Sequence, residues 1–201
     1  NEDIACPSEE DLEEGFVQNV QNPRLEDGRS YSEPAILTYP DQGEGGYMVG
    51  RYPPMTIEEG DHFRATIGCQ EGAEDCYVNY TLRIFRSGEG YDRLGMWLED
   101  YEGFYSPIDV DLSEFAGEEV EIVLSAISAD GTGENYALWL DPRIVNDPED
   151  AVEDPTPIDD VGYYEYYDVA RNYCDAGWET SVEDPISCPS EEDLEGGFVK
   201  L

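Results

Sequence analysis

Apolar and polar residues alternate one by one through the middle of this chain. The apolar positions are Phe63, Ala65 and Ile67 in one stretch, and Val78, Tyr80, Leu82 and Ile84 in the next. The positions between them are His62, Arg64 and Thr66, and then Tyr77, Asn79, Thr81 and Arg83. A period of two is that of a β-strand with one buried and one solvent-facing side. These stretches are therefore predicted to be strands of an antiparallel sheet.

The same pattern recurs between residues 33 and 145. Ile108, Val110 and Leu112 are expected to point inward, with Asp109 and Asp111 toward solvent. Further strands are expected at 120–127 and 136–144, and turn-forming residues occupy 53–54, 58–61, 87–90 and 130–133. One helical turn is expected at 113–116, with Ser113 as its cap. Short strands with almost no helix predict an all-β, antiparallel β-sandwich.

The stretch 6–17 and the stretch 188–199 are nearly identical. Cys6-Pro-Ser-Glu-Glu-Asp-Leu-Glu recurs from Cys188, and the two copies differ only where Glu14 corresponds to Gly196. Since 188 minus 6 is 182, the repeat has a period of 182 residues. We interpret the sequence as one repeat of a tandem array plus the start of the next. A motif used independently at two ends of one domain is the alternative.

This repeat suggests four parts. Residues 1–17 are expected to hold the end of a preceding connector and a first strand, and residues 18–145 the sandwich. Residues 146–161 are acidic and contain Pro148, Pro155 and Pro157, which predicts an extended linker. Residues 162–201 are expected to form a Tyr-rich connector, closed by a disulfide, and the start of the next repeat.

Five cysteines point to an oxidising, extracellular compartment. Cys69 and Cys76 flank a short polar loop and are predicted to form a disulfide, and Cys174 and Cys188 a second. Cys6 is the repeat equivalent of Cys188, so its partner is expected in a neighbouring unit. Zinc is the alternative for these residues, but the chain has no CxxC pair and only one histidine.

The charge of the chain excludes several partners. Forty-nine Asp and Glu residues against ten Lys and Arg give a net charge of −39, which repels nucleic acid and anionic membranes. No apolar run is long enough to span a membrane. We therefore expect a secreted protein at the cell surface, without membrane insertion, whose export signal has been removed or lies upstream.

Structural calcium is the metal that this composition favours, because carboxylates and carbonyls are hard oxygen ligands. Glu26, Asp27 and Asp141 lie near the expected first and last strands of the sandwich and form one candidate cluster. Asp130 and Glu134 form a second candidate. Solvated surface acid is the alternative for each residue.

Several stretches resemble a known family. Residues 51–69, 109–113 and 137–144 are similar to the jelly-roll modules repeated in large secreted proteins of filamentous bacteria, and residues 167–178 to the connector before such modules. The resemblance covers most of the chain and implies a jelly roll at the cell surface. Similar jelly rolls include carbohydrate-binding modules that hold calcium, but no sugar-binding motif carries over to residues here.

Three functions can be weighed on these residues. An enzyme is not expected, since His62 lies on a predicted solvent face and no nucleophile elbow, zinc-protease pair or phosphate loop occurs. A carbohydrate-binding, adhesin-like surface module is the alternative function that we retain. Its candidate sugar platform is Tyr91, Trp97, Tyr101, Phe104 and Tyr105, although Trp97 also suits a core position.

The function that the sequence favours is a structural repeat unit of an extracellular filament, stalk or sheath. A repeated module, a stiff linker and a disulfide toward the next unit are parts of an array held by head-to-tail contacts with copies of itself. The candidate assembly residues are Phe16, Val17, Tyr163, Tyr164, Tyr166, Tyr167, Phe198 and Val199. The alternative is that the tyrosines pack on their own module. Asn79-Tyr80-Thr81 is a sequon, so Asn79 is a candidate glycan attachment site.

Overall fold

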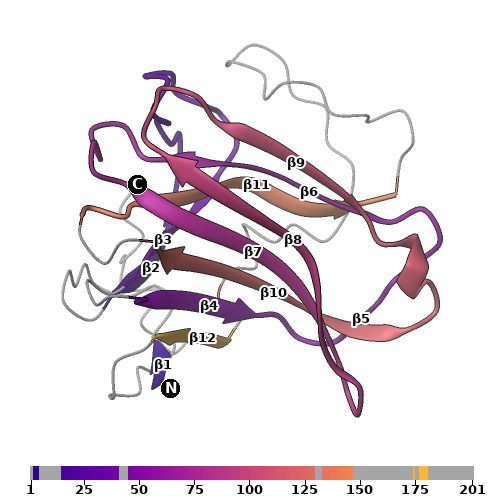
Figure 1. The fold of residues 1–201 in the computed structure, drawn as a ribbon. Coiled ribbons are helices and arrows are strands. Elements are labelled where there is room, and N and C mark those ends of the chain that lie inside the picture. The colour runs from indigo at the N-terminus through magenta and orange to yellow at the C-terminus, as the bar shows by residue number, and fades with distance from the viewer. Residues whose placement is uncertain are drawn as a thin grey trace, which may run out of the picture.

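The computed structural model describes residues 2–4, 15–40, 45–129, 133–146, 174 and 177–180, and every structural statement below concerns these residues. The chain is all-β, and its two antiparallel sheets pack face to face (Figure 1). This confirms the predicted fold class. No helix in the described ranges is long and apolar enough to cross a membrane.

The strands follow one another along the chain with one 3₁₀ turn between them. They are β1 (Glu2–Ile4), β2 (Phe16–Val20), β3 (Ala35–Tyr39), β4 (Tyr47–Arg51), β5 (Met55–Thr56), β6 (His62–Cys69), β7 (Tyr77–Arg86), β8 (Gly90–Asp100), β9 (Ser106–Asp111), η1 (Ser113–Phe115), β10 (Glu119–Ser128), β11 (Ala137–Val145) and β12 (Gly177–Thr180). The first sheet has the order β1-β12-β4-β10-β7-β8, with β5 paired to β10. The second has the order β2-β3-β11-β6-β9.

The strand order is that of a jelly roll. Strands β4, β10, β7 and β8 are consecutive in the first sheet, and β3, β11, β6 and β9 are consecutive in the second. The chain therefore crosses repeatedly between the sheets, and sequence neighbours such as β3 and β4 lie in different layers. This agrees with the jelly roll that the family resemblance implies.

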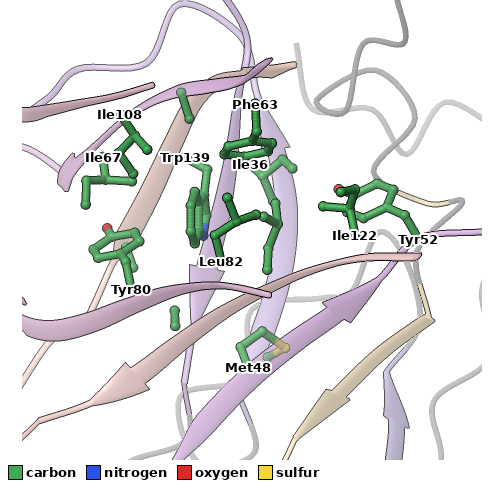
Figure 2. Packing of buried hydrophobic residues seen from close by; sticks show 14 of the residues in the cluster. Ile36, Met48, Tyr52, Phe63, Ile67, Tyr80, Leu82, Ile108, Ile122 and Trp139 are labelled. Carbon is green, nitrogen blue, oxygen red and sulfur yellow. The ribbon is translucent and has the colours of Figure 1, made fainter. Parts of the chain in front are cut away.

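The main core lies between the two sheets and is centred on Trp139. This side chain is fully buried, and its ring meets those of Tyr80 and Phe63 edge to face at centroid distances of 5.0 and 6.5 Å (Figure 2). Ile36, Leu82 and Ile122 are also fully buried in this core. Phe63, Tyr80 and Leu82 occupy apolar positions of the period-two pattern, so the alternation located the inner face of β7 correctly.

A second core covers the outside of the second sheet. Leu25 and Tyr31, from the segment between β2 and β3, pack with residues such as Leu138 on the side away from the main core. Arg64 and Thr66 were expected on a solvent face, but only 5% and 7% of their surfaces are exposed. That expectation was wrong because a period-two pattern cannot show what the rest of the fold packs on the polar side of a strand.

Buried Arg64 keeps its charge paired. Its Nε donates to Asp109 Oδ2 at 3.1 Å, and Asp109 Oδ1 lies 2.6 Å from His62 Nδ1. The pairing follows from the register of β6 with β9, in which Arg64 is opposite Asp109. Asp109 therefore neutralises an arginine that would otherwise be costly to bury.

The 3₁₀ turn lies where a helical turn was expected, but Ser113 does not cap it. The cap position is Leu112, which makes no side-chain capping hydrogen bond. Ser113 Oγ instead accepts the backbone N–H of Gly60 at 3.1 Å, and Asp111 Oδ1 accepts the backbone N–H of Ser113 at 2.8 Å. The serine thus joins the turn to the loop before β6.

Two of the expected boundaries were misplaced. β2 runs from Phe16 to Val20, so a first strand of the sandwich begins where it was expected but continues past the expected boundary at 17/18. β12 was expected in a separate connector, yet it pairs with β4 and extends the first sheet. Of the predicted linker, residues 146–161, only Asn146 is described, and it donates to the carbonyl of Glu59 and to Asp61 in the sandwich.

Candidate functional site

Two surfaces of the first sheet carry the features that point to a function. One is the edge formed by β8, and the other is the opposite edge, where β1 pairs with β12. We call the first the β8 edge, defined by Tyr91, Arg93, Met96 and Leu98, and the second the seam. Figure 1 shows them on opposite sides of β4, β10 and β7.

The β8 edge is apolar and exposed. The side of β8 that faces away from the core carries Tyr91, Met96 and Leu98, with 53%, 57% and 52% of their surfaces exposed. β8 has 11 residues and ends the sheet, so among the described strands only β7 pairs with it. A long edge strand with exposed apolar side chains is a template for pairing with another chain.

Two arginines face each other beside these apolar residues. Arg83 of β7 is directly opposite Arg93 of β8, because the register shifts between Leu82 and Arg83. Arg83 Nη2 donates to Ser125 Oγ at 2.9 Å, and its guanidinium lies over the ring of Tyr91, 5.3 Å from the centroid. Within the described residues, its Nε is buried without a hydrogen-bond partner.

A third arginine on the same face is already neutralised. Arg51 of β4 lies 3.9 Å above the ring of Phe85 and makes an ion pair with Glu121 through Nε. A second bond runs from Arg51 Nη2 to Glu121 Oε1 at 2.9 Å. Arg51 therefore differs from Arg83 and Arg93, neither of which makes an ion pair in the described part of the chain.

The five residues of the predicted sugar platform do not share one surface. Trp97 and Tyr101 pack against the main core, and Tyr105 meets Tyr31 edge to face at the second core. Tyr91 and Phe104 are exposed, Phe104 to 71%. The expectation of one aromatic platform was wrong, because successive residues of β8 point to opposite faces and Trp97 falls on the inner one.

Asn79 lies on the outer face of the first sheet, as the alternation predicts. It is half-buried and paired between Leu98 of β8 and Ile127 of β10. A glycan at this position would lie next to the β8 edge. Its attachment stays a prediction.

The first calcium cluster is not assembled. Glu26 lies beside Cys69, which is opposite Ala137 on the neighbouring strand β11. Asp141 comes four residues after Ala137 along β11, and its carboxylate makes an ion pair with Arg143. Asp27 accepts hydrogen bonds from Tyr31 and from the backbone of Arg29. Glu26, Asp27 and Asp141 therefore do not converge, and the adjacency expected from strand order was wrong.

The described residues contain no group of three or more potential metal ligands. Glu134 contributes its carbonyl oxygen to a bond with the N–H of Tyr136. Asp130, its expected partner in the second cluster, lies outside the described residues. Calcium binding stays a prediction.

Two carboxylates are buried at one end of the sandwich; sequence reasoning named Glu26 only as a calcium candidate and missed Glu99. Glu26 and Glu99 are each only 6% exposed. Burial raises the pKa of Glu26 above 4.5, although three backbone N–H groups that it accepts act in the opposite direction. Burial raises the pKa of Glu99 from 4.5 to about 7; Ser106 opposes this by a hydrogen bond, and the charges of Glu26 and Glu102 add to it.

One predicted disulfide is present. Cys69 and Cys76 are fully buried and bonded, with their Cα atoms 6.2 Å apart. Cys174 is half-buried and packs against the main core. Cys6 and Cys188, its candidate partners, lie outside the described residues, so the other pairings stay predictions.

The seam joins segments from the two ends of the repeat. Glu2 is opposite Thr180, Asp3 opposite Glu179 and Ile4 opposite Trp178, in antiparallel register. On its other side β12 pairs with β4, where Trp178 is opposite Gly50. The seam therefore attaches the segment before Cys6 to the sheet through the segment after Cys174.

The predicted assembly residues in the sandwich have a different role. Phe16 and Val17 are fully buried in their own module, and the ring of Phe16 stacks on that of Tyr39 at 5.0 Å. The expectation that these two join a neighbour was wrong, because their side chains are used by the module's own cores. Tyr163, Tyr164, Tyr166, Tyr167, Phe198 and Val199 lie outside the described residues.

The comparisons with known proteins add no relative. No protein family matches this chain, and no match was found among curated proteins.

Proposed function

We propose that this chain is a structural repeat unit of an extracellular filament, stalk or sheath, and that neighbouring units are joined at the seam. The observation that carries the proposal is the pairing of β1 with β12. The two segments come from opposite ends of a 182-residue repeat and meet at one sheet edge. An array needs such a place, where the end of one unit meets the start of the next.

The sequence offers two occupants for the position beside β12. With a period of 182 residues, Glu2 and Ile4 correspond to Asp184 and Ile186. Because Glu2 is opposite Thr180, Asp184 in the same place would leave residues 181–183 as a three-residue hairpin loop. Loops of this length are common in β-hairpins. The position beside β12 therefore suits both the start of its own unit and the start of the next.

Strand exchange at this position would link units. If residues 2–4 of one copy pair with β12 of another, the two copies share a sheet. The antiparallel register places the residues after Ile4 and those before Trp178 on the same side of that pair. Cys6 follows Ile4 by two residues and Cys174 precedes Trp178 by four, so a Cys6–Cys174 bond is within reach of an extended chain. The same bond would fix the exchange covalently.

Isotope mixing tests the linkage. Unlabelled and ¹⁵N-labelled chains are unfolded and reduced, mixed, refolded together under oxidising conditions, and digested without reduction. Linked units are expected to give peptides in which Cys6 of one label is bonded to Cys174 of the other. The Cys69–Cys76 peptide serves as the internal control, since that bond closes within one module and should carry a single label.

Imaging of the native material by electron microscopy is the second half of the test. Electron microscopy of the native material is expected to show fibres with a regular subunit spacing. Single-label Cys174 peptides together with dispersed single particles would defeat the proposal. A Cys174→Ser variant should abolish the mixed peptides while leaving the Cys69–Cys76 peptide unchanged.

A carbohydrate-binding surface module is the second candidate function. It is favoured by the exposed ring of Tyr91, which lies beside two arginines that make no ion pair among the described residues. Exposed aromatic rings stack on sugar rings, and guanidinium groups donate to their oxygens. Retention of the protein on a panel of immobilised polysaccharides tests this candidate, and Tyr91→Ala should abolish the retention.

A further inference from the structure

Arg83 and Arg93 are exceptional among the arginines of the described residues. The others all make ion pairs with carboxylates, and they are Arg24, Arg29, Arg51, Arg64, Arg86 and Arg143. Arg83 and Arg93 make none within the described ranges, although the chain contains 49 Asp and Glu residues. The carboxylate that balances their charge is therefore expected to come from outside this surface.

The arrangement of the two guanidinium groups is unfavourable in the isolated chain. Arg83 and Arg93 are directly opposite on neighbouring strands, and like charges in that position destabilise a sheet. Arg83 also buries its Nε without an acceptor among the described residues, which adds the cost of an unsatisfied donor. A carboxylate brought to this face would remove the repulsion between the two arginines.

The backbone of β8 adds a second, independent requirement. β8 is an 11-residue strand at the end of its sheet, and one row of its N–H and C=O groups points away from β7. Met96 and Leu98 are more than half exposed on the same strand. The partner that fits should therefore supply a backbone edge, apolar or aromatic side chains and a carboxylate, which together describe an acidic, aromatic β-strand.

One segment of this chain has that chemistry. Residues 163–168 read Tyr-Tyr-Glu-Tyr-Tyr-Asp, and tyrosine favours strands. In a strand, Tyr163, Glu165 and Tyr167 would share one face. That face presents a carboxylate between two aromatic rings, which complements Arg93 between Tyr91 and Met96.

We propose that residues 163–168 of a second copy add as a strand along β8, with Glu165 opposite Arg93. This contact rests on the proposed assembly function and gives it a non-covalent interface at the sheet edge opposite the seam. Local pairing is compatible with the net charge of −39, since charges beyond about 8 Å are screened at physiological ionic strength. Each copy then has an acceptor edge at β8 and a donor segment beyond the sandwich.

A charge swap in the full chain tests the contact. Self-association of wild type, Arg93→Glu, Glu165→Arg and the double variant is measured by analytical ultracentrifugation. Each single variant is expected to weaken association about tenfold or more, and the double variant to restore it. Arg24→Glu, an exposed position away from the β8 edge, is the matched control and should leave association unchanged. Circular dichroism checks that every variant is folded.

The outcomes separate this contact from the linkage at the seam. Unchanged association of Arg93→Glu, or failure of the double variant to recover, would refute the contact even if mixed-label Cys6–Cys174 peptides form. A synthetic peptide of residues 161–170 should bind the Glu165→Arg chain and lose affinity for Arg93→Glu. If oligogalacturonate binds through Arg93 and the peptide does not, the β8 edge is a glycan site and the proposal fails.

Discussion

The carboxylate of Glu26 accepts the backbone N–H of Cys69 through Oε1, at 3.0 Å. Its other oxygen accepts the backbone N–H groups of Glu102 and Gly103, at 2.8 and 3.0 Å. One buried side chain thus ties the segment between β2 and β3 to the end of β6 and to the turn after β8. The disulfide partner of Cys69 lies in the same region, so this end of the sandwich is held by both covalent and polar links.

Glu26→Gln should destabilise the fold. The amide keeps one acceptor oxygen, so at least one of the three N–H groups faces a donor. The expected loss is about 1–3 kcal/mol in the free energy of unfolding, measured by urea denaturation. Glu119→Gln, at an exposed position, is the control. Equal midpoints for the two variants would show that the three bonds contribute nothing.

Glu99 should make stability fall as the pH rises. Its pKa is raised in the fold to about 7 from 4.5, so the folded state holds the proton more tightly than the unfolded state. The favourable contribution is complete below pH 4.5 and is lost as the pH rises to about 7 and above. Glu99→Gln mimics the protonated form. Its stability relative to wild type should therefore increase by about 3 kcal/mol between these limits.

Urea denaturation of both proteins at several pH values between 4.5 and 8 measures this difference. Most other carboxylates are ionised above about pH 5.5, so the difference between the two proteins isolates Glu99 over the upper part of the range. A constant difference across the range would contradict the raised pKa. Glu119→Gln again provides the control for a solvent-exposed carboxyl.

Removing the Cys69–Cys76 disulfide should lower stability by about 2 kcal/mol. The bond closes a loop with a sequence separation of 7, and a short loop restricts the unfolded chain less than a long one. The double variant Cys69→Ala/Cys76→Ala tests this in thermal unfolding. A melting temperature equal to that of wild type would show that the loop needs no covalent closure.

Gly95 leaves room for the indole of Trp97. A Cβ atom at position 95 would lie 2.1 Å from Trp97 Cη2, so Gly95→Ala must displace the ring from its contact with the main core. The expected cost is about 1–3 kcal/mol, with a change in tryptophan fluorescence. In a Trp97→Leu background the same substitution should cost much less. If Gly95→Ala costs as much stability in the Trp97→Leu background as in wild type, the strain does not come from the contact with the indole.

The local patterns predicted the strands and one disulfide well. Period-two alternation depends on residues close in sequence, so the order of residues alone was enough to assign Val78 to Ile84 to a strand with an inner face. Cys69 and Cys76 are near neighbours, which made their bond predictable. The same pattern failed at Arg64, because burial of the polar side depends on contacts with the rest of the fold that the strand itself does not encode.

The sequence by itself determined that this chain forms an antiparallel sandwich whose two ends carry the same motif. The tertiary structure alone decided which side chains from distant parts of the chain meet. Without the register shift after Leu82, Arg83 would be opposite Leu94, and only the shift brings it opposite Arg93. Likewise Glu26 meets Cys69 and β1 meets β12 through pairings between segments far apart in the chain. Such pairings follow from the strand order and register of the whole fold, and local sequence patterns carry no information about them.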